Sequence, residues 1–233
     1  MRIDKYLSDC LAITRKESRR LISSGAVSVY GSIVSGAGLH VQGDGVTVDG
    51  APVSAEQVRV IMMDKPAGFL TAAEDSACRT VCDLLPNRFA KFMPIGRLDK
   101  DTTGLLLFTS DGGLAHRVIS PKYHVEKRYL ARIDKPISDK DIESFKSGVA
   151  LKDFTALPAK LERGEDEYSA YVTVTEGKYH QVKRMFAARG IYVERLRRLS
   201  VGDLVLGGME EGGVRPLTRE EEESLYRSVG LRG

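Results

Sequence analysis

The first 25 residues place apolar side chains at helical spacing. Three of them are four residues apart and fall on one side of a short helix: Ile3, Leu7 and Leu11. A second helix is expected over residues 15–23, because Thr14 and Glu17 have the spacing of a capping box and Gly25 follows as a stop signal. The pattern therefore predicts two short helices in succession.

After the second helix the apolar pattern changes to the alternation of β-strands. Valines alternate with polar residues in two places: Val27 with Val29, and Val46 with Val48. A small β element is therefore expected after the helices. Residues 50–57 contain a proline and several small side chains, which indicates a linker. We expect one domain at residues 1–58 and a second at residues 59–233.

The remainder of the chain mixes strand and helix patterns without strict alternation. Strands are expected at residues 59–63, 105–109, 128–133 and 168–175. In the last of these, one side is expected to carry Tyr168, Ala170, Val172 and Val174. Helices are expected after the capping pairs Ser138/Asp141 and Thr218/Glu221, and at residues 181–189 before Gly190. This mixed order predicts an α+β fold with a largely antiparallel or mixed sheet.

The composition is that of a globular protein outside the membrane. Of the 233 residues, 42% are hydrophobic and 29% are charged. The apolar runs fall far short of the ~18 residues that a membrane helix needs, and Asp4 and Asp9 stand where a secretory signal would be apolar. Three cysteines are too few for a disulfide framework and fit a reducing cytosol. We therefore expect a cytoplasmic protein with no membrane contact and, because Cys78 and Cys82 lack partner ligands, no zinc.

Charge is segregated along the chain although the net charge is only +3. Residues 1–20 carry six basic and three acidic groups, a balance of +3, whereas residues 21–58 have no Lys or Arg and carry −3. Residues 178–198 have seven basic groups and one glutamate, a balance of +6, and residues 209–223 carry −4. Two separate basic segments are typical of a protein that binds a polyanion. The alternative for either segment alone is an ordinary solvated helix face.

Two segments of the first domain resemble the S-four-type RNA-binding domain, also called the alpha-L motif: RIDKYLSDCLAITRKESRRLISSGAVSVYGSIV and VQGDGVTVDG. In that family, paired helices present basic side chains to structured RNA. The resemblance implies RNA contacts for Arg2, Lys5, Arg15, Lys16, Arg19 and Arg20. The sequence departs from the family after Gly25, where such domains often carry further lysines or arginines and this chain has none. We therefore expect a module that positions phosphates and reads little sequence.

A polar loop at residues 96–104 leads directly into the apolar run at residues 105–108. Glycine stands at each end of this loop, and a buried strand after it would hold a short carboxylate at the edge of a sheet. Asp99 and Asp101 both qualify. An Asx-type turn that only prepares the strand is the structural alternative.

The loop and its flanks, GRLDKDTTGLLLFTSDG, resemble the signature of pseudouridine synthases of the RsuA/RluA branch. Further matching blocks follow the family's order along the chain: MDKPAGF, EKRYLARI, and EGKYHQVKRMFAARG with LRRLSVG. The segment YHQVKRM is more similar to the RsuA subgroup, which acts on 16S ribosomal RNA, than to relatives directed at 23S RNA. Two alternatives stay open: a 23S-directed enzyme, and a non-catalytic RNA-binding factor for ribosome assembly.

The resemblance implies roles for five residues. Asp99 matches the catalytic aspartate, and Arg97 matches the arginine that contacts RNA and helps to hold the extruded nucleotide. Tyr129 matches the tyrosine that packs on the uracil and is a candidate for handling the carbon-5 proton. Lys183 matches the basic partner of the aspartate, and Leu196 matches the apolar residue that closes the uracil pocket.

Other residues of the same blocks have weaker assignments. Asp101 falls at a variable position of the loop, so the resemblance gives it no catalytic role. His180, Arg184 and Arg198 lie in the second basic segment and are expected to contact RNA. That segment as a whole is expected to line an RNA cleft beside Asp99.

The chemistry of the isomerisation fits this set of residues. Breaking a carbon–nitrogen bond and rejoining uracil through carbon-5 adds no atoms and transfers no electrons, so we expect neither cofactor nor metal. An ionised Asp99 could form a covalent intermediate or abstract a ribose proton, and the sequence leaves both routes open. Lys183 would keep Asp99 charged in a dry pocket. The uracil must leave its stack, and Tyr129 would recover part of that cost. We expect a monomer that acts on 16S RNA, within a partly assembled small ribosomal subunit.

Overall fold

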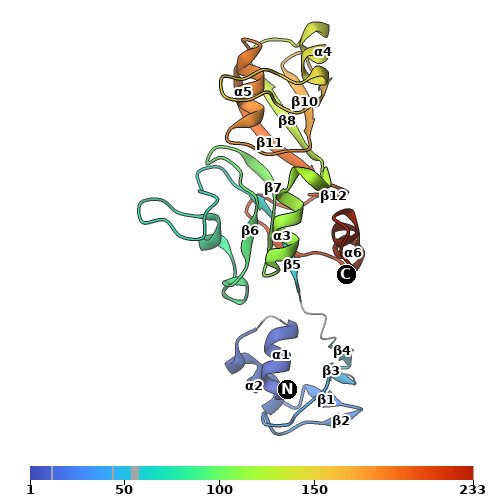
Figure 1. Cartoon of the computed structure of the whole chain (residues 1–233). Coiled ribbons are helices and arrows are strands. Elements are labelled where there is room, and N and C mark those ends of the chain that lie inside the picture. Colours follow the sequence, from blue (N-terminus) through green and yellow to red (C-terminus); the bar gives the residue numbers. More distant parts are fainter. Residues whose placement is uncertain (12, 44, 54–57, 233) are drawn as a thin grey trace. The chain divides into compact units, whose positions relative to one another are not determined.

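The computed structural model describes residues 1–11, 13–43, 45–53 and 58–232, and it divides into two compact units (Figure 1). The first unit comprises Met1–Arg59 together with Pro86–Lys91, and the second comprises Val60–Leu85 and Phe92–Gly233. The expected linker is corrected in part, because Ala51–Pro52 form a strand. Its remaining stretch at residues 54–57 lies outside the described residues.

The first unit combines two helices with a small antiparallel sheet. Its elements are α1 (Ile3–Leu11), α2 (Arg15–Ser23), β1 (Val27–Val29), β2 (Ser32–Ile33), β3 (Val46–Val48) and β4 (Ala51–Pro52). The strands are ordered β2-β1-β3-β4. Thr14 and Glu17 form the expected capping box of α2. Ile3, Leu7 and Ile22 belong to the apolar core that joins the helices to the sheet.

The second unit is built on one large sheet. Its strands are β5 (Val60–Lys65), β6 (Met93–Ile95), β7 (Thr103–Thr109), β8 (Lys127–Ile133), β9 (Lys160–Arg163), β10 (Ser169–Val174), β11 (Val193–Val201), β12 (Leu204–Val205) and β13 (Val214–Pro216). The central order is β13-β5-β7-β11-β8-β10-β9, with β6 paired to β7 and β12 paired to β11. Within the described residues, β7 and β11 are the one parallel pair of strands. The expected α+β class with a largely antiparallel sheet is confirmed.

Helices cover this sheet at two places (Figure 1). They are α3 (Gly112–Ile119), α4 (Asp139–Ser147), α5 (Gln181–Ala188) and α6 (Arg219–Ser228), with 3-10 turns at Val81–Leu84, Asn87–Phe89 and Pro121–Tyr123. Phe145 of α4 packs against Phe186 of α5, with ring centroids 5.1 Å apart. At the other place, Val118 of α3 and Leu225 of α6 pack into a core with Leu107 of β7. In the part of the chain that the structure describes, no helix is long and apolar enough to cross a membrane.

Several elements differ from the expectation. Strand β10 begins at Ser169, so Tyr168 lies outside it and is 37% exposed. Helix α3 was not predicted, because its first two residues are glycines and only Asp111 marks its N-cap. The central strand β11 was also missed, because its run of arginines has the composition of a solvated segment.

Candidate active site

Asp99 lies in the loop between β6 and β7, and Lys65 at the end of β5 holds the backbone of that loop. The ammonium of Lys65 is fully buried and donates hydrogen bonds to the carbonyl oxygens of Thr102 (2.9 Å) and Lys100 (3.3 Å). Burial lowers the pKa of Lys65 to about 8, against the opposing influence of nearby carboxylates. The loop is therefore fixed by a buried donor that bonds to the residues just beyond Asp99.

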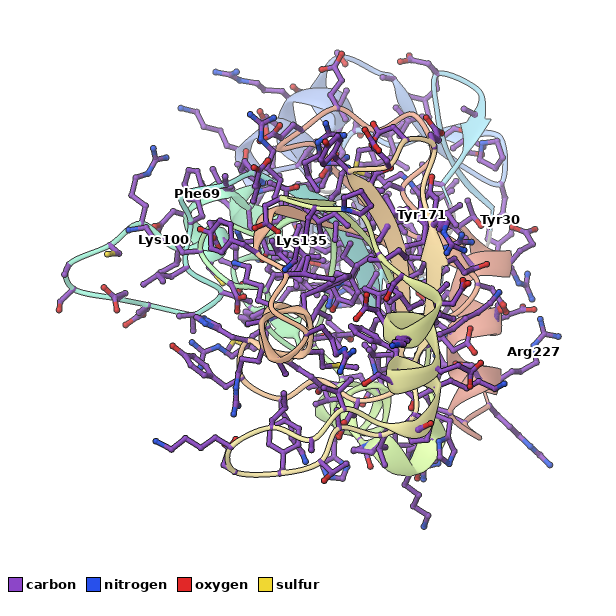
Figure 2. All side chains as sticks on the ribbon, turned by 90° about the horizontal axis from the view of Figure 1, so that it is seen from above. Tyr30, Phe69, Lys100, Lys135, Tyr171 and Arg227 are labelled. Atoms are coloured by element: carbon purple, nitrogen blue, oxygen red, sulfur yellow. The ribbon has the colours of Figure 1, made fainter. Side chains whose placement is uncertain are left out.

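The segment after β5 supports the other side of the same loop. The backbone N–H of Gly68 donates to the carbonyl oxygen of Lys100 at 2.7 Å. The hydroxyl of Thr71, which is buried, donates to the carbonyl oxygen of Leu98 at 2.7 Å and accepts from its N–H at 3.1 Å. Phe69 and Lys100 accordingly lie on the same side of the second unit (Figure 2). These contacts explain why the MDKPAGF block and the aspartate loop form one structural piece.

A cleft opens beside Asp99 and is lined by the five residues with a predicted catalytic or nucleotide-binding role, together with one of the predicted RNA contacts. They are Arg97, Asp99, Tyr129, His180, Lys183 and Leu196. The empty space of this cleft, open mouth included, is about 430 Å³. The structure thus brings together six side chains from four separate stretches of the chain.

Part of the cleft wall is apolar, and an exposed arginine also lines the cleft. Tyr129 on β8 is 8% exposed and Leu196 on β11 is 5% exposed, and both line the cleft. Because β8 and β11 are adjacent strands, with Leu196 paired to Ala131, the two side chains rise from the same region of the sheet. Arg97 is exposed in the loop that also carries Asp99. This arrangement offers a flat aromatic face and an aliphatic neighbour to a planar guest.

Two cationic or titratable side chains approach the carboxylate of Asp99. Lys183 Nζ lies 3.5 Å from Asp99 Oδ2, and His180 Nε2 lies 3.4 Å from Asp99 Oδ1. Lys183 makes a shorter contact of 2.5 Å with Asp101 Oδ1, and this hydrogen bond holds the pKa of Asp101 below its usual range. The family resemblance assigns no catalytic role to Asp101. The structure shows that it shares the ammonium of Lys183 with Asp99.

The turn that precedes α5 is held by a buried pair of side chains. Glu176, which is 3% exposed, accepts a hydrogen bond from Gln181 Nε2 at 2.7 Å. The Oε1 atom of Gln181 accepts from the N–H of Lys178 at 2.9 Å. His180 has a positive φ of 49° at the N-cap of α5 and stacks on Tyr179, with ring centroids 3.9 Å apart. The position of His180 beside Asp99 is therefore set by the turn.

Arg198 does not have the surface position expected of an RNA contact. Its side chain is 4% exposed, and its Nε donates to the carbonyl oxygen of Leu105 at 2.7 Å. Its Nη1 lies 3.5 Å from the hydroxyl of Tyr129. Arg198 is paired with Tyr129 across β11 and β8, so its guanidinium is turned into the protein. These contacts place Arg198 as an internal neighbour of Tyr129. Its expected contact with RNA stays a prediction.

The basic segment at residues 178–198 does not form one continuous cationic surface. Three of its arginines form ion pairs with carboxylates: Arg184 with Asp153, Arg189 with Asp141, and Arg197 with Asp64. Lys178, His180 and Lys183 do line the cleft. Only part of the segment lines the cleft beside Asp99. Contact of the rest of the segment with RNA, including contact by Arg184, stays a prediction.

The predicted cations of the first unit are all at its surface. Every one of them is exposed: Arg2, Lys5, Arg15, Lys16, Arg19 and Arg20. Four belong to α2, and two lie at or near the start of α1. Their contact with RNA stays a prediction.

Sequence reasoning missed Lys65 and Thr71, although the block that contains Lys65 had been noticed. In the sequence analysis Lys65 appears only as a member of the MDKPAGF block, with no role of its own. A lysine inside a run of buried apolar residues is the signal that could have identified it, because such a lysine needs several acceptors. Among the described residues, no group of three or more His, Cys, Asp and Glu side chains is placed to hold a metal ion.

Comparison with known proteins identifies a family. The family model described as RNA pseudouridylate synthase matches residues 59–188. The chain is 43% identical over 232 residues to the ribosomal small subunit pseudouridine synthase A of Vibrio parahaemolyticus, covering 97% of this chain and 100% of that protein. It is 40% identical over 232 residues to the protein of that name in Escherichia coli (strain K12), with the same coverage.

Two further matches extend over almost the whole chain. An uncharacterised RNA pseudouridine synthase of Bacillus subtilis (strain 168) is 43% identical over 230 residues, covering 95% of this chain and 96% of that protein. A crystal structure of a pseudouridylate synthase is 36% identical with a TM-score of 0.68, covering 97% of this chain and 99% of that chain. The similarity therefore includes both units.

Proposed function

This chain belongs to the RsuA family of RNA pseudouridine synthases, and from that premise we propose that it converts one uridine of 16S ribosomal RNA to pseudouridine, with Asp99 as the catalytic carboxylate. The observation that carries the proposal is the cleft in which Asp99, Tyr129 and Lys183 meet. The 16S assignment rests on relatives that are named for the small ribosomal subunit.

The target uridine would leave its stack and enter the cleft. Extrusion of a base costs a few kcal/mol, and stacking on an aromatic ring recovers about 1–3 kcal/mol. Tyr129 would cover one face of the uracil, with Leu196 as its apolar neighbour, and both line the cleft. Arg97 at the exposed rim would hold the displaced backbone.

Asp99 would then act on the ribose, either at the anomeric carbon or on the neighbouring proton. In both routes the bond from N1 to the anomeric carbon breaks, and a bond from carbon-5 forms in its place. Carbon-5 loses a proton and N1 gains one, so the isomerisation is balanced without another reactant. Lys183, 3.5 Å from Asp99, supports the ionised carboxylate. Tyr129 is our candidate for handling the proton of carbon-5.

The first unit would anchor the enzyme on folded RNA through its exposed cations. We further propose that the enzyme acts in the cytoplasm as a monomer on a partly assembled small subunit. Phosphate contacts release counterions, so removal of residues 1–58 should weaken binding and flatten its salt dependence.

The test is to find the product. Purified protein is incubated with transcribed 16S RNA, transcribed 23S RNA and partly assembled small subunits, and new pseudouridines are located by chemical mapping. Ribosomal RNA from cells with and without the gene is mapped in parallel. One new site in 16S RNA is expected. Product in 23S RNA alone would overturn the assignment of 16S RNA as the substrate. Absence of product in every RNA would overturn the proposed function.

A further inference from the structure

A shielded carboxylate lies beneath three exposed arginines in the first unit. Asp4, near the start of α1, is 0% exposed. The residues around it, here called the arginine triad, are Arg2, Arg15 and Arg19, whose side chains are 48%, 46% and 57% exposed. They come from two sequence segments that meet at this carboxylate.

Hydrogen bonds saturate this carboxylate. Oδ2 of Asp4 accepts from Arg15 Nη2 at 2.6 Å and from Arg19 Nε at 3.1 Å. Arg2 donates from Nε to Oδ1 at 3.3 Å and from Nη2 to Oδ2 at 3.4 Å. Four contacts are about the acceptor capacity of one carboxylate. The hydrogen bond from Arg15 outweighs the effect of burial and holds the pKa of Asp4 well below its usual range.

A structural role alone does not account for this arrangement. An acid in the first turn of α1 is favoured by the helix dipole, but an exposed carboxylate would serve that purpose equally well. Exposed ion pairs add little to stability, and Asp4 gathers three arginines that water would otherwise solvate. The consequence of the pairing is geometric: three long and flexible side chains share one fixed point.

The triad keeps the capacity to bind an anion. Each guanidinium has five N–H groups, and the hydrogen bonds to Asp4 use one or two of them. Three positive charges and one negative charge leave a balance of +2 at the surface. Fixed guanidinium groups bind phosphate with less loss of side-chain freedom than mobile ones.

We propose that Asp4 is a positioning residue that holds the arginine triad as one preorganised site for backbone phosphates of the folded RNA. This inference rests on the proposed function for the identity of the RNA. It adds to that function a built phosphate site whose central residue is itself negative. It also makes a prediction opposite in sign to simple electrostatics, since removal of a negative charge should weaken the binding of a polyanion.

The test compares Asp4→Asn with Asp9→Asn in the full chain. Both changes remove one negative charge from α1, but Asp9 is exposed. The affinity for transcribed 16S RNA is measured over a range of salt concentrations. Asp4→Asn should weaken binding about tenfold and reduce the slope of log affinity against log salt by about one, because phosphate contacts are lost. Asp9→Asn should leave the affinity within about twofold or tighten it slightly.

Turnover separates this result from failure of the catalytic proposal. At saturating RNA, Asp4→Asn should keep the wild-type kcat and show a raised KM, because the cleft of the second unit is unchanged. Thermal unfolding checks that the variant is folded. Binding by Asp4→Asn that is equal to or tighter than wild type, with the same salt slope, would overturn the inference. Absence of product with the wild-type protein would instead contradict the proposed function and leave the binding comparison intact.

A second set of variants keeps the inference testable if Asp4→Asn unfolds. Arg15→Gln and Arg19→Gln change exposed side chains of α2, and each should weaken RNA binding severalfold. Lys16→Gln, also exposed on α2, is the control for loss of one positive charge. If the triad acts as one site, Arg15→Gln and Arg19→Gln should each cost more affinity than Lys16→Gln. Equal losses of RNA affinity in these three variants would overturn the proposal that the triad is a preorganised site.

Discussion

Lys183 donates its shortest hydrogen bond, 2.5 Å, to Asp101 rather than to the aspartate that the family motif identifies. Asp101 is 73% exposed in its side chain, whereas Asp99 is 24% exposed. The ammonium of Lys183 thus lies between a carboxylate that faces water and one that faces the cleft. Because the two carboxylates share a cation and a loop, they form a matched pair for mutation.

Replacement of Asp99 by Asn should abolish turnover. The amide keeps the shape of the side chain but cannot serve as a nucleophile or base, so we expect a loss on the order of 10³-fold or more. Affinity for 16S RNA should stay within about threefold, since the contacts with phosphate are elsewhere. Single-turnover assays and equilibrium binding measure the two effects separately.

The control for this change is Asp101→Asn. This change removes one negative charge at a position two residues from Asp99, and the ammonium of Lys183 then pairs with Asp99 alone. Turnover should therefore stay within about threefold of wild type. A loss in Asp101→Asn as large as that in Asp99→Asn would contradict the assignment of the catalytic carboxylate.

Tyr129 combines an aromatic face with a hydroxyl, and two substitutions separate them. Tyr129→Phe keeps the ring and should bind RNA within about threefold of wild type. If the hydroxyl handles the carbon-5 proton, turnover should fall on the order of 10²-fold. Rapid-quench kinetics of product formation measure this step. If Tyr129→Phe turns over at the wild-type rate, the hydroxyl has no role in the mechanism.

Tyr129→Ala removes the ring as well. The loss of stacking should cost a further 1–3 kcal/mol or so in transition-state binding, which lowers kcat/KM about 5- to 160-fold below that of Tyr129→Phe. The comparison requires that Arg198, whose Nη1 lies 3.5 Å from the hydroxyl, does not rearrange. Thermal unfolding of both variants checks that condition, and equal kcat/KM in the two would contradict a stacking role.

Local signals in the sequence were sufficient for several elements of the fold. Helices α2, α4 and α6 begin at the capping boxes that were predicted, because a cap depends on residues three positions apart. Strand β11 was missed for the opposite reason. Its arginines are accommodated by distant partners, such as Asp64 for Arg197, and no local pattern shows those partners.

The same distinction applies to the active site. The motif resemblance named Asp99, Tyr129, Lys183 and Leu196, and the structure places all of them at one cleft. The resemblance could not show that Asp101 takes the shorter contact with Lys183, because that depends on a fraction of an ångström in the path of the loop. It also could not show that Arg198 points inward, since only the pairing of β11 with β8 determines this.

The buried ammonium of Lys65 should make stability depend on pH above neutrality. Burial lowers the pKa of Lys65 from its ordinary 10.5 to about 8. Between about pH 8 and 10.5 the unfolded chain therefore holds more protons than the folded chain, and the free energy of unfolding rises with pH. Relative to Lys65→Met, the wild type should gain on the order of 1 kcal/mol or more across that window. Denaturant unfolding at pH 7.5 and 9.5 measures the difference.

Lys152→Met is the control for this measurement. Lys152 is exposed, so the difference in free energy of unfolding between wild type and Lys152→Met should not depend on pH. The free energy of unfolding of the wild type minus that of Lys65→Met should rise with pH. If this difference stays constant or falls as pH rises, the result would contradict a desolvated ammonium at this position.

Gly104 joins the loop of Asp99 to β7, and there the strand approaches β11 more closely than a side chain permits. Its φ is +104°, and an added Cβ would overlap the carbonyl oxygen of Arg198. The backbone of Gly104 is paired with that of Arg198 in the parallel ladder between the two strands. Glycine at this position therefore fixes the distance between the strand that follows Asp99 and the strand that carries Leu196.

Gly104→Ala should lower the free energy of unfolding by about 2–3 kcal/mol, because both the backbone angle and the contact are unfavourable for alanine. Turnover should fall as well, since β7 follows the loop of Asp99 and β11 carries Leu196, and both of these residues line the cleft. Gly112→Ala is the control: Gly112 begins α3, and an added Cβ there meets nothing within 4 Å. Alanine at that position should be neutral or stabilise by up to about 1 kcal/mol. Denaturant unfolding and single-turnover assays measure both variants, and a Gly104→Ala protein with wild-type stability would show that the two strands can separate without cost.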